Sequence, residues 1–237
     1  MSRPRLALLD ASHGDESTRR NFRRELDATL AEFDVTAGAT PATFDYDGVV
    51  VTGSRSSVYW DEAWIPDLLD WIAAADARDL PVLGVCFGHQ ALASALGGTV
   101  ADMGEYELGY RTVAHRGGPL FDGVPQEFTA FTTHSDAVTD LPPGAELLAE
   151  NDYGVHAFRK DHAFGVQFHP EYDAETARRI TREKDLPDAH IRSVLDGITP
   201  AAVDAAQAPK RLFENFVDYA SRVDPDREPD GGAVAGD

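Results

Sequence analysis

The chain's only cysteine, Cys86, lies in a run of residues that could present a thiol at a sharp turn. The run Gly84-Val85-Cys86-Phe87-Gly88-His89-Gln90 follows an apolar stretch at 80–83 and precedes a small-residue segment with helical patterning at 91–96. A strand, a sharp turn and a helix are therefore expected in succession, an arrangement that exposes a nucleophile at a helix N-terminus. Free backbone N–H groups and the helix dipole favour a thiolate there. Glycine at positions 84 and 88 leaves the room that such a turn requires.

A cysteine nucleophile needs a general base, and the downstream run Gly165-Val166-Gln167-Phe168-His169-Pro170-Glu171 offers one. His169 ends an apolar segment, so its ring is expected to project from the edge of a sheet. Glu171 follows two residues later, and its carboxylate could hold the imidazole in one tautomer. The expected roles are attack on a carbonyl by Cys86, proton transfer by His169 and orientation of that imidazole by Glu171.

These two motifs together resemble the class I glutamine amidotransferase family, and most nearly the glutaminase domain of GMP synthetase and its stand-alone relatives. The resemblance covers about residues 5–185 and depends on Gly-x-Cys-x-Gly-x-Gln after a strand with a later His-Pro-Glu. It implies hydrolysis of the γ-amide of glutamine through a γ-glutamyl thioester on Cys86, which yields glutamate and ammonia for a separate synthetase. It implies no cofactor, because a thiol, an imidazole and backbone amides suffice for this reaction.

The resemblance also implies an oxyanion loop at Thr52-Gly53-Ser54-Arg55-Ser56-Ser57, where the family typically has Ser-Gly-Gly-Pro-x-Ser. The expected donors are backbone N–H groups at Gly53 or Ser54 and at Phe87, because a backbone N–H can serve an oxyanion whatever side chain it carries. Glu107-Leu108-Gly109 resembles the start of a strand that the family writes Glu-x-Gly.

Further matches imply contacts with the substrate. The segment 133–136 resembles a His-x-Asp stretch whose backbone holds the α-amino and α-carboxylate groups of glutamine in the family. Gln90, near the nucleophile, resembles a glutamine whose side chain contacts the substrate in the family. Arg55, in the expected oxyanion loop, could meet a carboxylate beyond the γ-glutamyl group. A structural role is the more usual interpretation for His134 and an equally open one for Asp136, and Gln90 could simply cap or pack. The expected substrate-binding residues are Gln90, His134, Ser135, Asp136 and Arg55.

The net charge of −20 and the pI near 4.6 argue against binding to nucleic acid. With only three lysines, this composition favours a salt-adapted protein. The chain has no run of eighteen apolar residues, so no membrane contact is expected, and a single cysteine permits no intramolecular disulfide, which favours a cytoplasmic location. No metal site is expected, because six histidines are scattered without metal-ligand spacing: His13, His89, His115, His156, His162 and His190.

Alternating apolar and amphipathic segments predict an α/β fold with a mostly parallel, flavodoxin-like central sheet flanked by helices, an added antiparallel strand segment and a single domain. The expected amidotransferase domain spans 1–222, with a core at about 5–185, a helical extension at 186–222 and a disordered acidic tail at 223–237. Strands are expected at 5–9, 47–53, 80–85, 109–114, 128–133, 145–149, 155–158 and 164–168. Helices are expected at 18–33, 62–78, 88–96, 173–184, 188–196 and 201–222.

Two other functions fit the same motifs. The first is a stand-alone hydrolase of γ-glutamyl peptides or γ-glutamyl amines, for which the departures at Ser54 and Arg55 leave room. The second is a non-catalytic regulatory or binding subunit, although an intact set of Cys86, His169 and Glu171 disfavours it.

Overall fold

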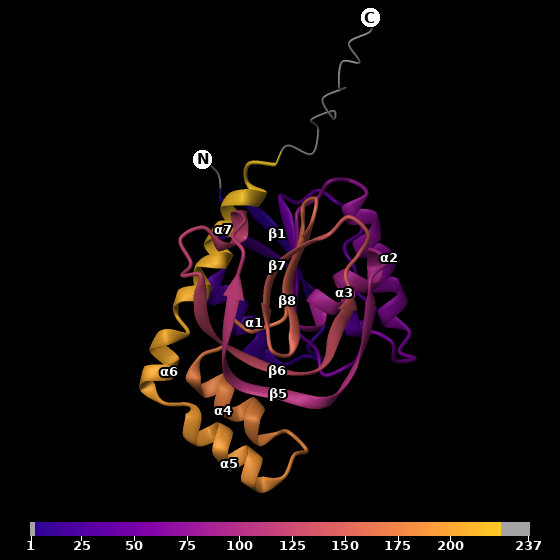
Figure 1. Cartoon of the computed structure of the whole chain (residues 1–237). Helices are drawn as coiled ribbons and strands as arrows, with labels where there is room; N and C mark the ends of the chain where they lie inside the picture. The colour runs from indigo at the N-terminus through magenta and orange to yellow at the C-terminus, as the bar shows by residue number, and fades with distance from the viewer. Residues whose placement is uncertain (1–2, 224–237) are drawn as a thin grey trace, which may run out of the picture.

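A nine-stranded mixed sheet runs through the computed structural model, which describes residues 3–223 (Figure 1). The strand order is β2-β1-β3-β4-β9-β8-β7-β5-β6. The first five strands of this order pair in parallel and the remaining pairs are antiparallel. The predicted α/β fold with an added antiparallel segment is therefore confirmed. The expected acidic tail, from residue 224 onward, lies outside the described residues.

The parallel part has the strand order of a flavodoxin-like sheet. Its central strands are short and fully buried, as expected of strands covered on both faces. Nearly all of their residues are Val, Leu, Gly, Ala or Phe. The five strands are β1 (Arg5–Asp10), β2 (Thr29–Asp34), β3 (Gly48–Val51), β4 (Val82–Val85) and β9 (Ala163–Val166).

The antiparallel part extends the sheet beyond β9. Its longest pairing joins β5 to β6, with an irregularity between Asp102 and Glu107. These two strands form the long curved ribbon seen in Figure 1. The four strands are β5 (Thr99–His115), β6 (Glu127–Asp140), β7 (Glu146–Asn151) and β8 (Gly154–Lys160).

Helices cover both faces of the sheet. Helices α1 (Glu16–Glu25) and α7 (Arg211–Ala220) pack on one face through Phe22, Phe213 and Phe216, which have no exposed surface. Helices α2 (Trp64–Asp76) and α3 (Phe87–Ala95) pack in a second apolar cluster with β3 and β4. A third cluster joins β5 and β6 to helices α4 (Ala174–Arg182), α5 (Asp188–Gly197) and α6 (Pro200–Ala205). No helix within 3–223 has the length and apolar character needed to cross a membrane.

Two of the helix predictions were wrong. The segment 18–33 is not one helix, because α1 ends at Glu25, Leu26 turns to an extended conformation (φ −93°, ψ 109°) and β2 pairs in parallel with β1. The segment 201–222 is not one helix either. It forms α6, the short 3-10 helix η3 (Ala208–Lys210) and α7, with Pro209 at the break, where proline cannot continue a helix.

The strand predicted at 109–114 is only the second half of β5, which begins at Thr99. The first half was missed because exposed and acidic residues interrupt its apolar pattern, so that pairing with β6 defines it instead.

Candidate active site

The predicted sharp turn is present between β4 and α3. Cys86 has φ 54° and ψ −106°, an uncommon conformation for a residue with a side chain, and its N–H donates to Val166 O at 2.8 Å. Space at the turn is minimal: a Cβ at Gly84 would lie 2.2 Å from Gly88 O, and one at Gly88 would lie 2.3 Å from Val51 O. Only glycine fits these two positions, and their packing holds the cysteine in its strained conformation at the start of α3.

A buried imidazole–carboxylate pair lies beside this turn. His169 Nδ1 is 2.8 Å from Glu171 Oε1, and both side chains are almost completely buried. The His169 N–H donates to Phe131 O at 2.8 Å, which ties the segment after β9 to β6. With Nδ1 engaged by the carboxylate, Nε2 has no hydrogen-bond partner among the described residues. The imidazole therefore has one nitrogen fixed and the other free for proton transfer.

The side chains of Cys86 and His169 both approach Gly53. A Cβ on this glycine would lie 3.1 Å from His169 Cε1 and 3.6 Å from Cys86 Cβ, so all three residues share one small space. Burial lowers the pKa of His169, but electrostatic attraction by Cys86 and by the bonded Glu171 carboxylate raises it to about 10. The charge balance of the site therefore favours an imidazolium.

Tyr172 is a site residue that the sequence reasoning missed. Its ring stacks on that of His169 with centroids 4.1 Å apart and an angle of 22° between the planes. Burial and the charges of Glu171 and Cys86 raise its pKa well above 10, so the phenol stays neutral. Its place directly after the His-Pro-Glu motif was the one signal in the sequence, and it did not specify a stacking contact.

The site opens into a cavity of about 470 Å³. Cys86 and His169 lie in its lining, together with Gly53, Ser54 and Arg55 of the expected oxyanion loop. The opposite walls come from the loop between β1 and α1 and from the C-terminal half of α4 and the residues just after it, which sequence reasoning did not assign to the site. There, Arg179 pairs with Asp15 at 2.6 Å and with Glu183 at 3.0 Å.

The expected oxyanion loop is held by one hydrogen bond at its start and shaped by another within it. Thr52 Oγ1 accepts from the Ala11 N–H at 2.9 Å, and Ser54 Oγ accepts from the Ser56 N–H at 3.2 Å. Phe87 is the first residue of α3, so its N–H has no acceptor within the helix. An oxyanion role for Gly53, Ser54 and Phe87 stays a prediction.

The other residues expected to contact substrate do not line the cavity. Gln90 Nε2 donates to Asp136 O and to Gln167 Oε1, both at 3.1 Å. The Asp136 carboxylate accepts from Ser57 and Tyr59 hydroxyls at 2.5 and 2.8 Å. The cavity is lined on this side by Thr133 and not by Gln90, His134, Ser135 or Asp136, so direct contact of those four residues with a substrate stays a prediction.

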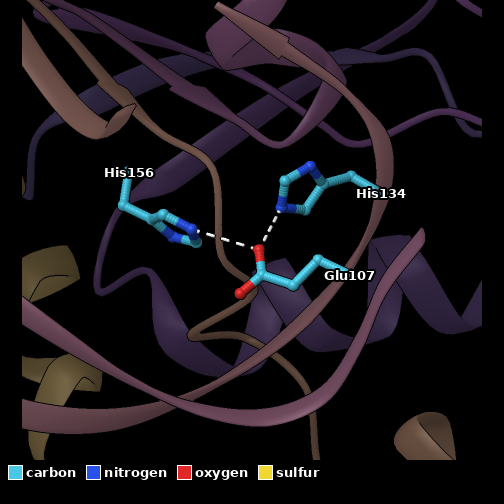
Figure 2. Close-up of side chains that lie close together, drawn as sticks. All are labelled: Glu107, His134 and His156. Atoms are coloured by element: carbon cyan, nitrogen blue, oxygen red, sulfur yellow. Dashed lines mark hydrogen bonds and ion pairs between the residues drawn. The ribbon is translucent and has the colours of Figure 1, made fainter. Parts of the chain in front are cut away.

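A buried carboxylate connects two of the histidines in the antiparallel part of the sheet (Figure 2). Glu107 Oε2 lies 2.5 Å from His134 Nε2 and 3.1 Å from His156 Nε2, and its Oε1 accepts from Asn151 Nδ2 at 2.7 Å. Burial raises the pKa of Glu107, but the two histidines lower it to about 2, so the carboxylate is charged at neutral pH. The donor atoms lie within 4.8 Å of one another, as metal ligands could. Both oxygens of Glu107 already bond protein groups, Oε2 with His134 and Oε1 with Asn151.

Comparison with known proteins matches the chain to one family. The family model described as glutamine amidotransferase class-I matches residues 11–184. Curated relatives include two GMP synthases described as glutamine-hydrolyzing. That of Thermomicrobium roseum is 40% identical over 126 residues, which cover 52% of this chain and 23% of the relative. That of Pyrobaculum aerophilum is 42% identical over 141 residues, which cover 58% and 26%. The chain thus spans about a quarter of the length of these relatives.

Solved structures share the fold over nearly the whole chain. A glutamine amidotransferase of Thermotoga maritima superposes with a TM-score of 0.76 at 21% identity, covering 94% of this chain and 100% of that one. A putative GMP synthase subunit from Thermoplasma acidophilum gives a TM-score of 0.66 at 20% identity, covering 93% and 96%.

Proposed function

Because the chain belongs to the class I glutamine amidotransferase family, we propose that it hydrolyses the γ-amide of glutamine through a γ-glutamyl thioester on Cys86. The observation that carries the proposal is the arrangement of Cys86 at a strained turn and the hydrogen-bonded His169–Glu171 pair around one cavity. A nucleophile, a base and an orienting carboxylate within one cavity are what nucleophilic acyl transfer needs.

In the first half of the reaction, the sulfur of Cys86 adds to the amide carbon. The oxygen then carries negative charge, which backbone N–H groups of Ser54 or Gly53 and of Phe87 are proposed to stabilise. The His169 imidazolium gives its proton to the leaving nitrogen, the C–N bond breaks, and ammonia departs. Glu171 holds the imidazole through Nδ1 and stabilises its charge.

In the second half, His169 takes a proton from water as the water oxygen attacks the thioester carbonyl. The C–S bond breaks, the thiolate of Cys86 is restored beside the imidazolium, and glutamate leaves. No oxidant, reductant or further reactant is needed, so the reaction balances as glutamine plus water giving glutamate plus ammonia.

A separate synthetase is the proposed consumer of the ammonia. The support comes from the matched relatives, which are GMP synthases about four times as long as the matched region, and from the Thermoplasma structure described as part of a GMP synthase. In this proposal, residues 1–222 form the amidotransferase domain, with a core at about 5–185 and a helical extension at 186–222.

A substrate panel tests the proposal. Glutamate release from glutamine in molar KCl should depend on Cys86 and disappear in Cys86→Ala, with the equally buried Ala93→Ser as a control for a small change on the same helix. Equal turnover of glutamine by Cys86→Ala would refute the mechanism. Because free amidotransferases can be slow without their synthetase, labelling of Cys86 by an electrophilic glutamine analogue is measured as well. Absence of both labelling and turnover would leave a non-catalytic regulatory role as the function.

Hydrolysis of γ-glutamyl peptides is a second candidate, favoured by the cavity lining. Arg55 and Lys184 both line the cavity, and neither forms an ion pair among residues 3–223. The Lys184 Nζ lies 5.1 Å from the centre of the Tyr106 ring, and together with Arg55 it could bind a carboxylate beyond the γ-glutamyl group. A kcat/KM for γ-glutamyl dipeptides above that for glutamine, reduced in Arg55→Gln, would favour this candidate. Activity on glutamine alone would exclude it.

A further inference from the structure

Asp136, on β6, joins several buried polar groups through both its backbone and its side chain. Its carbonyl oxygen accepts from Gln90 Nε2 at 3.1 Å and lies 2.9 Å from His134 Nδ1. Its carboxylate accepts from the Ser57 hydroxyl at 2.5 Å and from the Tyr59 hydroxyl at 2.8 Å. The residue is 6% exposed, and its bonds with Gln90, His134 and Ser57 are buried, so that their loss is costly, whereas the bond from the half-exposed Tyr59 is only partly buried.

The backbone carbonyl connects to the nucleophile and to the base. Gln90 lies on α3 one turn after Cys86, and its N–H donates to the Cys86 carbonyl oxygen at 3.2 Å. The same Gln90 side-chain nitrogen also donates to Gln167 Oε1 at 3.1 Å, two residues before His169. Displacement of the Asp136 carbonyl would therefore disturb both the helix that begins at the thiol and the strand end that carries the imidazole.

The carboxylate connects to the oxyanion loop. Ser57 closes the segment 52–57, which contains Gly53 and Ser54, and Tyr59 follows two residues later. Both hydroxyls donate to the Asp136 carboxylate, which lies 79 and 77 residues later in the sequence. The loop is thus fastened to β6 at its C-terminal side, in addition to the Thr52 hydroxyl bond near its start.

Asp136 is itself held by residues of the antiparallel part of the sheet. His134, which contacts the Asp136 carbonyl through Nδ1, is held through Nε2 by the charged Glu107 carboxylate (Figure 2). Glu107 is in turn held by Asn151 of β7 and lies 3.1 Å from His156 of β8. Four strands therefore fix the position of one residue at the edge of the site.

We propose that Asp136 is a positioning residue, which holds the segments carrying Cys86, His169 and the oxyanion loop in one arrangement. The inference depends on the proposed function, and it replaces the substrate contact that the family resemblance implies for this residue. All polar atoms of the Asp136 side chain bond protein groups, and the residue does not line the cavity.

The test is steady-state glutamine hydrolysis by Asp136→Asn. The carboxamide keeps the shape but has one acceptor oxygen where two hydroxyls donate, so one donor must turn away. A displacement of about 1 Å in catalytic groups can cost about 100-fold in rate. We expect kcat to fall roughly 10- to 100-fold while KM changes less than about threefold, because no substrate contact is removed.

Matched variants separate positioning from general destabilisation. Asp34→Asn makes the same change in a carboxylate that also accepts from a hydroxyl, that of Thr36 at 2.6 Å, but at the end of β2 and outside the cavity. It should leave kcat unchanged. Ser57→Ala removes one donor from the opposite end, and the double variant with Asp136→Asn should cost less than the two single changes combined.

The possible outcomes distinguish the two claims. A rise in KM with unchanged kcat in Asp136→Asn would overturn the inference and restore direct substrate contact. Unchanged kcat and KM would also overturn it. If Asp136→Asn does not fold, Ser57→Ala/Tyr59→Phe removes both donors instead, and unchanged kcat in that variant would overturn the inference equally. Failure of the unmodified chain to show any Cys86-dependent turnover would instead refute the proposed function, and this inference with it.

Discussion

Replacement of Glu171 by glutamine should remove much of the preference of His169 for its charged form. Burial opposes that form, but the charges of Cys86 and Glu171 raise the pKa of His169 from 6.5 to about 10. This rise corresponds to about 5 kcal/mol in favour of the imidazolium. Because Glu171 orients the ring through Nδ1 and supports its positive charge, Glu171→Gln should lower kcat about 100-fold, which is the lower end of what a positioned acid or base contributes.

The assay is glutamate release at saturating glutamine across a range of pH. A raised pKa means that the imidazolium is present below that pKa and is lost as pH rises through about 10. In Glu171→Gln this loss should occur at lower pH, so the alkaline limb of the kcat profile should move to lower pH.

Glu175→Gln is the matched control, because Glu175 is an exposed carboxylate in the first turn of α4, only four residues from Glu171. It should leave kcat and the pH profile unchanged. A Glu171→Gln variant with the kcat and alkaline limb of the unmodified protein would show that the carboxylate does not act through His169.

Three further predictions concern the turn, the buried carboxylate and the surface charge. Gly88→Ala should reduce turnover at least tenfold and destabilise the fold by about 1–3 kcal/mol, because its Cβ would lie 2.3 Å from Val51 O. Gly197→Ala is the control, because nothing lies within 4 Å of a Cβ there. Equal activity and an equal urea midpoint in the two variants would contradict the prediction. Glu107→Gln should lower the free energy of unfolding by about 3 kcal/mol near pH 6, because the pKa of Glu107 is lowered from 4.5 to about 2. In urea titrations this loss should shrink as pH falls from 5 towards 3. A difference that does not change with pH would disprove the prediction. The thermal midpoint should rise between about 0.1 M and about 2 M KCl as salt screens a net charge of −20, and a midpoint that falls or stays constant would count against salt adaptation.

The sequence specified the turn at Cys86 well because its determinants are local. Gly84 and Gly88 lie within two residues of the cysteine, and the structure shows that each contacts backbone that admits no side chain. The His169–Glu171 pair is also local, since the two residues that bond are only two positions apart in sequence. Short spacing and the need for glycine make such features readable from a sequence.

Elements and contacts that depend on distant pairing were harder to predict. Leu26 and Leu30 have helical spacing, yet Leu30 lies in β2, which pairs in parallel with β1. The cluster of Glu107, His134 and His156 joins residues from β5, β6 and β8, whose register is set by the whole antiparallel segment. No spacing pattern along the chain could have brought these three side chains together.

The most direct test of the proposed mechanism is mass spectrometry of the protein quenched in acid during turnover of glutamine. We predict a γ-glutamyl adduct on the peptide that contains Cys86, formed only with substrate and absent from Cys86→Ala. Glutamate release at the same rate from Cys86→Ala, with no adduct on the unmodified protein, would contradict covalent catalysis by Cys86.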